Sequence, residues 1–288
     1  MASAEVSAAA GAKARAGASS TPRTQPAGRI DVATVGGILL AVGAIVGGLL
    51  LEKGSVADIA QYTAALIVMG GTAGAVMVST PIHVLKGALR RLRSVFKNQD
   101  ADPRMVIQEL IEYASRARKN GLVSLEPAVA QIGDRFLRKG LGLAVDGTDL
   151  QELRRILELE MTLAEHYAES EVKVFESAGG YSPTIGIIGA VMGLIQVMKN
   201  LANIDEVGHG IAVAFVATVY GVAAANIFFL PAATKIKSRI QHECHMREMM
   251  LEGTLGIAEG LNPRLLEAKL EAFLLEGAPG KPAKSGRP

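Results

Sequence analysis

Two apolar runs that contain no acidic or basic residue constrain this chain more than any other feature of its sequence. Residues 183–198 and 210–230 hold no Asp, Glu, Lys, Arg or His, and Pro231 follows the second run directly. Apolar runs of about 20 residues are typical of helices that cross the roughly 30 Å hydrocarbon core of a bilayer. Hydroxyls such as that of Thr218 can line a polar path there, but neither run supplies a carboxylate that could carry a proton. If this chain moves ions, a second protein must bring the titrating group.

The amino-terminal part of the chain contains two more apolar stretches of membrane-spanning length. The first is Val32–Leu51 and the second covers approximately residues 59–79. All four stretches are expected to be helices, because lipid offers no hydrogen-bonding partner to unpaired backbone groups. Residues 183–198 are short for a span, so a buried helix of a soluble domain is the alternative for that run. No segment shows the alternation of a strand, and we expect an all-α integral membrane protein with four transmembrane helices.

Basic residues precede the first stretch, so a cleaved signal peptide is the alternative for this end of the chain. The stretch is too long for a signal-peptide core and no small-x-small cleavage site follows it, which favours an uncleaved helix. The resulting organisation is a disordered tail (1–29), transmembrane helices 1 and 2 (30–80), a cytoplasmic helical domain (81–180), transmembrane helices 3 and 4 (181–231), cytoplasmic carboxy-terminal helices (232–276) and a second disordered tail (277–288).

Capping residues place the helices of the soluble segments. Asp102-Pro103 predicts a helix that ends at Gly121, and Asp149 and Asn262-Pro263 predict the starts of two later helices. One more helix is predicted by apolar residues at helical spacing, namely Leu125, Val129, Ile132 and Phe136.

Lysines and arginines gather on one side of the predicted spans. A cluster without any acid follows the second span and another cluster follows the fourth: Lys86, Arg90, Arg91, Arg93 and Lys97, then Lys235, Lys237 and Arg239. The short linkers within each pair of spans carry Lys53 and Lys199 beside several acids. Because basic loops stay in the cytoplasm, both termini and the central segment are expected to face the cytoplasm.

Glycines spaced four residues apart occur in three of the predicted spans. The pairs are Gly43 and Gly47, Gly70 and Gly74, and Gly189 and Gly193. Small residues at this spacing let membrane helices approach closely. They can serve packing within one subunit or between subunits, and both remain open from the sequence. Four thin helices around an ion path favour an oligomer.

Motifs for catalysis or cofactor binding are lacking. The chain has no P-loop, dinucleotide fingerprint or nucleophile motif. The sequence around His242 and His245 offers too few ligands on one helix face for a closed metal site. We therefore expect neither an enzyme nor a bound cofactor, metal or nucleic acid.

Several motifs resemble the MotA/PomA family of flagellar stator proteins. They are residues 177–194 (SAGGYSPTIGIIGAVMGL), 217–221 (ATVYG), 226–231 (NIFFLP), 118–126 (RKNGLVSLE), 145–147 (VDG) and 262–264 (NPR). The resemblance extends over about residues 30–275 and includes the layout of four spans. The related ExbB and TolQ proteins have three spans.

The resemblance implies a torque-generating subunit that couples ion flow across the bacterial inner membrane to rotation of the flagellar motor. In the family, five copies surround a dimer of a single-span subunit, MotB or PomB, whose helix carries an aspartate. The cytoplasmic domain pushes on the rotor protein FliG. The partner's aspartate would be the carboxylate that this chain lacks. An energiser subunit of the ExbB/TolQ type is the alternative function.

Three residues of the apolar runs are candidates for the ion pathway and its coupling. From the sequence alone, Pro183 and Pro231 are candidate helix ends, because proline lacks an N–H. The hydroxyl of Thr218 would bond to a carbonyl of the preceding turn. The resemblance implies instead that both prolines couple ion passage to conformational change and that Thr218 faces the partner's aspartate.

Three neighbours complete the candidate pathway. Tyr220 lies about 200° around a helix from Thr218 and is expected to pack between helices. Ala190 and Ala217 stand where sodium-type relatives carry threonine. Sodium needs several oxygen ligands in place of its water shell, so we expect the transported ion to be a proton.

Arg118 and Glu126 match the charged residues by which the family contacts the rotor. The alternative is that both are ordinary solvated surface charges. A further charged position of sodium-type relatives is absent, because Pro127, Ala128 and Val129 follow Glu126.

Overall fold

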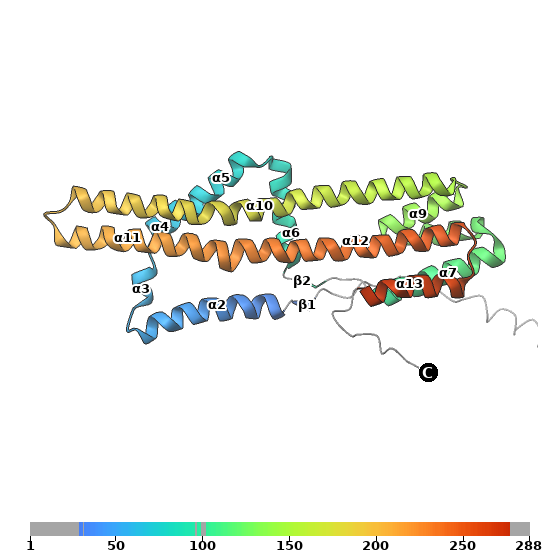
Figure 1. Cartoon of the computed structure of the whole chain (residues 1–288), viewed down its shortest axis with the longest axis horizontal. Helices are drawn as coiled ribbons and strands as arrows, with labels where there is room; N and C mark the ends of the chain where they lie inside the picture. The colour runs from blue at the N-terminus through green and yellow to red at the C-terminus, as the bar shows by residue number, and fades with distance from the viewer. Residues whose placement is uncertain (1–28, 31, 96, 99–101, 277–288) are drawn as a thin grey trace, which may run out of the picture.

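Two very long antiparallel helices dominate the fold (Figure 1). One is α10, Leu150–Lys199. The other runs over Ile204–Ala258 without a break, as α11 (Ile204–Ala223), the π-helical turn η3 (Ala224–Phe229) and α12 (Leu230–Ala258). This computed structural model describes residues 29–30, 32–95, 97–98 and 102–276. The two predicted tails therefore lie outside the described residues, apart from Arg29.

Four helices are long and apolar enough to cross a membrane, as predicted. The first, α2, has the predicted bounds Val32–Leu51. The second is Tyr62–Ser79, built from α4 (Tyr62–Ala65), the π-helical η1 (Leu66–Gly70) and α5 (Gly71–Ser79). It starts later than predicted, because α3 (Val56–Ile59) forms a separate helical turn. The third and fourth lie in the apolar halves of the two long helices, which confirms the all-α membrane architecture.

Helix α2 stands apart from the other spans. None of its residues is buried, and Lys235 of α12 donates a hydrogen bond to the Thr34 hydroxyl at 2.7 Å. Next to α2, β1 (Arg29–Ile30) pairs antiparallel with β2 (Lys97–Asn98). The sequence did not predict this pairing, because two residues are too few to show an alternating pattern.

The soluble end of the molecule has one hydrophobic core built from segments far apart in the sequence. The helices α7 (Pro103–Asn120), α9 (Arg135–Val145) and α13 (Pro263–Glu276) pack around the ends of α10 and α12 (Figure 1). The helices and the turn after α7 contribute fully buried leucines: Leu110, Leu125, Leu137, Leu141, Leu153, Leu157, Leu266 and Leu270. Residues 232–276 thus share a core with the central segment, and the borders 180/181 and 231/232 fall inside continuous helices.

The capping residues act as predicted. The carboxylates of Asp102 and Asp149 accept the backbone N–H groups of Arg104 and Gln151, each at 3.0 Å. Asn262 caps α13 in the same way, and Gly121 ends α7 at φ 82°.

The single helix predicted to run through Leu125 and Phe136 is wrong. The chain forms a 3-10 turn, η2 (Leu122–Leu125), one turn of α8 (Glu126–Val129) and then a new helix at Arg135. The sequence contains the reason, because the Asp134 carboxylate accepts the Leu137 N–H at 2.9 Å and starts α9.

Helix α6 (Ile82–Val95) follows α5 and lies across the two long helices (Figure 1). Its buried residues Val84 and Ala88 pack against Val172 and Phe175 of α10 and Ile236 of α12. This second core lies just beyond the residues where the third and fourth spans begin and end.

Three charges tie α10, α12 and α13 together at the soluble end. Arg154 Nη1 lies 3.2 Å from Glu252 Oε1, and Lys269 donates to Glu252 Oε2. Burial alone would raise the pKa of Glu252, but the hydrogen bond and charge of Lys269, with the charge of Arg154, outweigh it and lower this pKa below its ordinary value of 4.5. The ionised form of Glu252 therefore stabilises the docking of α13.

We expect Glu252→Gln to lower the free energy of unfolding at pH 7 by about 1 kcal/mol. The thermal unfolding midpoint in detergent should fall by a few degrees as a result. A lowered pKa in the folded state gives stability that is present above the unfolded pKa and lost as the pH falls through the folded value. The difference between the two proteins should therefore shrink below about pH 4.5. Glu267→Gln, which changes an exposed residue of α13, is the control. It should change neither the thermal midpoint at pH 7 nor the way the midpoint depends on pH.

Candidate ion-pathway and coupling residues

The backbones of α10 and α11 touch because glycines line their contact. A Cβ atom on Gly186 would lie 2.9 Å from the Ala217 carbonyl oxygen, and one on Gly221 would lie 2.6 Å from the Ser182 carbonyl oxygen. Only glycine fits at these two positions without a shift of the helices, because real Cβ atoms essentially never lie within 3.0 Å of a non-bonded heavy atom. Three more glycines share this close packing: Gly189, Gly193 and Gly210. The pair Gly189 and Gly193 thus packs within the subunit.

Pro183 lies inside α10 and does not end it, so the prediction of a helix end is wrong. Proline removes the N–H that would pair with the Gly179 carbonyl, yet membrane helices tolerate this where neighbouring helices support the backbone. Here α11 gives that support, because the Pro183 Cα lies 3.2 Å from a Cβ position built on Gly221.

Pro231 is also wrong as a predicted helix end, because it lies in the first turn of α12 within the continuous Ile204–Ala258 helix. The π-helical turn η3 ends two residues before it and shifts the hydrogen-bond pairing by one residue, which accommodates the missing N–H. Leu230 packs 2.6 Å from the Cβ position of Gly179, one turn from Pro183. Pro183 itself lies beside Gly221, ten residues before Pro231, so the two prolines are about 15 Å apart along the helix axes.

Thr218 lies within about one helical turn of the level of Pro183, with its Cα 3.5 Å from the Cβ position of Gly186. Its half-buried hydroxyl donates to the Ala214 carbonyl at 3.1 Å, as expected from the sequence alone. A hydroxyl also has two acceptor lone pairs. The oxygen can therefore still accept a hydrogen bond from another group.

Ala217 and Tyr220 face the second span. Ala217 is fully buried and packs with Ala64, Val68 and Val216, while its Cβ lies 2.8 Å from the Cβ position of Gly189. The Tyr220 hydroxyl donates to the Ile59 carbonyl, which places this side chain between helices, where we expected it. Ala190 is half-buried on α10, next to Gly189.

Two buried hydroxyls were missed in the sequence. Ser182 and Thr72 are 0% and 2% exposed, and neither side-chain oxygen has a hydrogen-bond partner among the described residues. Ser182 directly precedes Pro183 and faces α11 through its backbone. A serine beside a proline in an apolar run is the signal that could have marked it.

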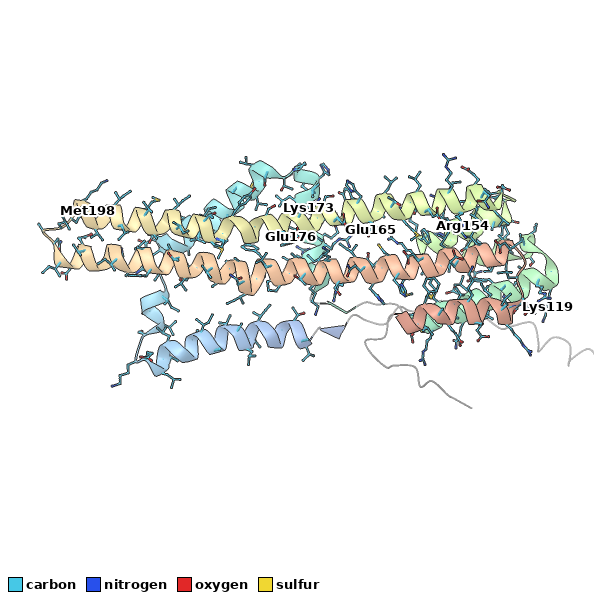
Figure 2. All side chains as sticks on the ribbon, in the orientation of Figure 1. Lys119, Arg154, Glu165, Lys173, Glu176 and Met198 are labelled. Atoms are coloured by element: carbon cyan, nitrogen blue, oxygen red, sulfur yellow. The ribbon has the colours of Figure 1, made fainter. Side chains whose placement is uncertain are left out.

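Arg118 and Glu126 lie at the end of the molecule farthest from the loop between α10 and α11. Figure 2 shows Lys119, the neighbour of Arg118, at the opposite end from Met198. Arg118 is in the last turn of α7 and Glu126 begins α8, with the buried Leu125 anchoring the turn between them. Both charged side chains are exposed, and the described residues include no ion-pair partner for them.

We predict that Gly221→Ala forces α10 and α11 apart, because the added Cβ would meet backbone atoms of Ser182 and Pro183. The cost should be about 1–3 kcal/mol, measured as a lower thermal midpoint in detergent. The control is Gly208→Ala on the same helix, where a Cβ meets nothing within 4 Å. Alanine favours helix there, so equal losses in both variants would contradict the packing argument.

Comparison with known proteins gives consistent results over nearly the whole chain. A sequence model of the MotA/TolQ/ExbB proton channel family matches residues 128–249, and one of the Motility protein A N-terminal region matches residues 35–121. Motility protein A of Helicobacter pylori is 38% identical over 256 residues, which cover 89% of this chain and 98% of that protein. Chemotaxis protein PomA of Vibrio alginolyticus is 30% identical over 86% of this chain and 97% of its own length.

Two solved structures show the same fold. The C. jejuni MotAB structure matches with a TM-score of 0.82 and 35% identity, covering 87% of this chain and 98% of that one. The flagellar MotAB stator complex of Bacillus subtilis matches with a TM-score of 0.76 and 34% identity. The match covers 85% of this chain and 98% of that one. Together with the four spans and the glycine-packed hairpin, these matches show that the chain belongs to the MotA/PomA group of flagellar stator proteins within the MotA/TolQ/ExbB proton channel family.

Proposed function

We propose that this multi-pass inner-membrane stator subunit conducts protons only together with a MotB-type partner that contributes an aspartate. The observation that carries the proposal is the acid-free hairpin of α10 and α11. Pro183 and Thr218 lie within about one helical turn of each other on it, and neither apolar run holds an Asp, Glu, Lys, Arg or His. The partner's single helix would lie against this hairpin and bring its carboxylate to the Thr218 hydroxyl.

The choice of proton over sodium rests on the small number of oxygen atoms available. Ala217 fills its site completely, so a hydroxyl cannot be added there without displacing Gly189 or the second span. Ala190 contributes no oxygen from its side chain. Thr218 alone gives a sodium ion too few ligands, whereas one hydroxyl beside a carboxylate is enough to relay a proton.

The orientation and the assembly belong to the same proposal. Basic clusters after the second and fourth spans favour cytoplasmic termini and a cytoplasmic soluble domain. A Cβ on Gly43, Gly47, Gly70 or Gly74 would meet nothing within 4 Å, so these glycines are free for contacts with other subunits. Five copies around a partner dimer is the arrangement we propose. The exposed Arg118 and Glu126 then point away from the membrane toward the rotor protein FliG.

The first test measures proton flux into vesicles with a pH-sensitive dye. We expect no specific flux from this chain alone, flux from the complex with its partner, and none when the partner's aspartate is changed to asparagine. The flux should not depend on sodium. Conduction by the single chain, or a requirement for sodium, would contradict the proposal.

Thr218→Ala in the same assay should lower the proton flux of the complex severalfold, because the relay hydroxyl is lost. The matched control is Thr234→Ala. Thr234 bonds back to the Leu230 carbonyl at 3.0 Å but lies on α12, beyond the fourth span. Equal flux from both variants would remove Thr218 from the pathway.

The rotor contact is tested by charge reversal in a motile host that lacks its own stator genes. Arg118→Glu or Glu126→Lys should reduce swimming strongly, because an attraction to FliG becomes a repulsion. Membrane abundance should stay unchanged, since both side chains are exposed and unpaired within the described residues. Arg104→Glu, at the other end of α7, serves as the control. Normal swimming of both test variants would show that these are solvated surface charges.

A further inference from the structure

Helix α6 presents a face of cations and apolar side chains that the proposed function does not use. Lys86, Arg90 and Arg93 are exposed, and none of them has an ion-pair partner among the described residues. Ile82 and Leu89 are 60% and 56% exposed. At 100° per residue these five side chains occupy one side of the helix. The helix itself contains no acid.

The opposite side of α6 is fixed to the long helices by an ion pair in which the carboxylate is buried and the arginine is half-buried. Arg91 Nε lies 2.5 Å from Oε2 of Glu171, a residue of α10 that is 5% exposed. A Cβ on Gly87 would overlap Glu171 Oε1, so this glycine makes room for the carboxylate. A buried pair with this geometry costs desolvation energy but allows only one arrangement of the helices.

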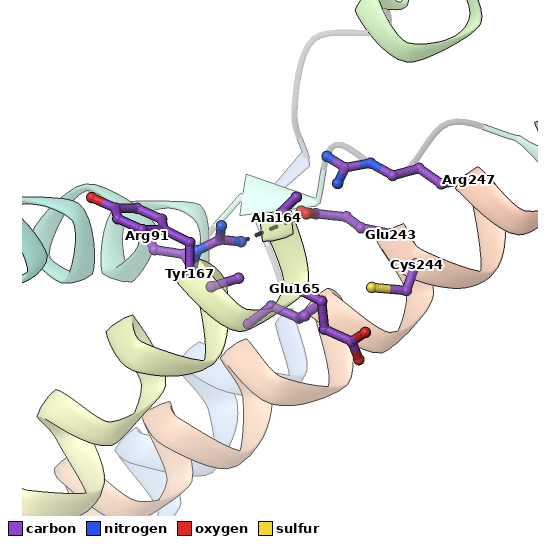
Figure 3. Close-up of a pocket in the computed structure, with 9 residues that line it drawn as sticks. Arg91, Ala164, Glu165, Tyr167, Glu243, Cys244 and Arg247 are labelled. Carbon is purple, nitrogen blue, oxygen red and sulfur yellow. Dashed lines mark ion pairs between the residues drawn. The ribbon is translucent and has the colours of Figure 1, made fainter. Parts of the chain in front are cut away.

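Arg91 also reaches the other long helix. Its Nη1 lies 3.6 Å from Oε2 of Glu243 on α12, and Figure 3 shows the two side chains facing each other beside a cavity of about 170 Å³. Arg247 and Cys244 line the same cavity, and burial raises the pKa of the Cys244 thiol. The inward charge of α6 is thus satisfied by protein carboxylates, whereas the three outward charges are not.

The location of α6 places its outward face at the edge of the bilayer. The helix begins three residues after Ser79, the last residue of the second span, and lies across the long helices (Figure 1). Its buried face contacts α10 and α12 next to Ala178 and Ala232, where the third and fourth spans begin and end. A helix that is perpendicular to the spans at this level lies parallel to the membrane surface.

We propose that the exposed face of α6 binds anionic phospholipid headgroups of the surrounding membrane. Lys86, Arg90 and Arg93 contact the phosphates, while Ile82 and Leu89 enter the boundary between headgroups and acyl chains. Interfacial helices combine apolar and basic residues in this way, and long basic side chains reach the headgroup layer while their stems remain apolar. An acidic protein partner would not require the two exposed apolar residues beside the cations.

The test uses the stator complex purified with its partner and reconstituted into phosphatidylcholine vesicles. Spin-labelled phosphatidylglycerol or spin-labelled phosphatidylcholine is added as a tracer, and electron paramagnetic resonance gives the immobilised fraction of each. We expect an excess of immobilised phosphatidylglycerol that falls as salt is added. The K86Q/R90Q/R93Q variant should lose at least about half of this excess, because each cation near the surface strengthens the attraction about fivefold.

The matched control is R135Q/R138Q/R264Q, which removes the same charge from exposed arginines at the soluble end. It should keep the preference, and so should R90K/R93K, because a headgroup attracts either cation. An equal loss in the control, an unchanged preference in the K86Q/R90Q/R93Q variant, or displacement of the tracer by millimolar inorganic phosphate would overturn the proposal. If the triple variant does not assemble, the salt titration of the unmodified complex decides. A preference that persists in 1 M salt would then overturn it.

Discussion

The close contact between α10 and α11 determines where an ion can pass. In lipid, helices gain little from the hydrophobic effect when they associate, so dense contact between small residues holds them together. The backbones meet at Gly186 and Gly221, and no space for a solvated path remains between the two helices. The ion path that we propose therefore runs along the outside of this hairpin, against a helix from another protein. The geometry and the absence of acidic residues independently support the proposed partner.

The two long helices connect this hairpin to the soluble core without an intervening loop. At 1.5 Å per residue, the 50 residues of α10 extend about 75 Å. Their regular hydrogen bonding is interrupted in one stretch of about 15 Å, by Pro183 in α10 and by η3 with Pro231 in the adjacent helix. A change in helix direction at this point would be carried as a rigid tilt to the core around Leu153 and Met249, and so to the exposed turn between α7 and α8.

The sequence predicted most of the fold but not the behaviour of its prolines. Val32–Leu51 was placed correctly because apolar length alone defines a span, and Asp102 and Asp149 were correct because capping is a local interaction. Neither proline ends its helix, although proline lacks the N–H that would continue the hydrogen-bond ladder. Packing against α11 supports the backbone at Pro183, and the π-helical turn η3 does so before Pro231. The shared core of residues 81–180 and 232–276 also escaped prediction, since it depends on contacts between residues more than 100 positions apart.

The Arg91–Glu171 pair shows why part of a site cannot be read from sequence. Glu171 is one of many glutamates on α10, and nothing in its immediate neighbours distinguishes it from the exposed Glu165 and Glu169. Its burial depends on Gly87, which is distant in sequence and removes the one side-chain carbon that would occupy the same space. Replacing such a pair with apolar residues often costs no stability. Its value here lies in specificity, because apolar packing alone would let α6 slide along α10 and α12, whereas a short ion pair holds one crossing position.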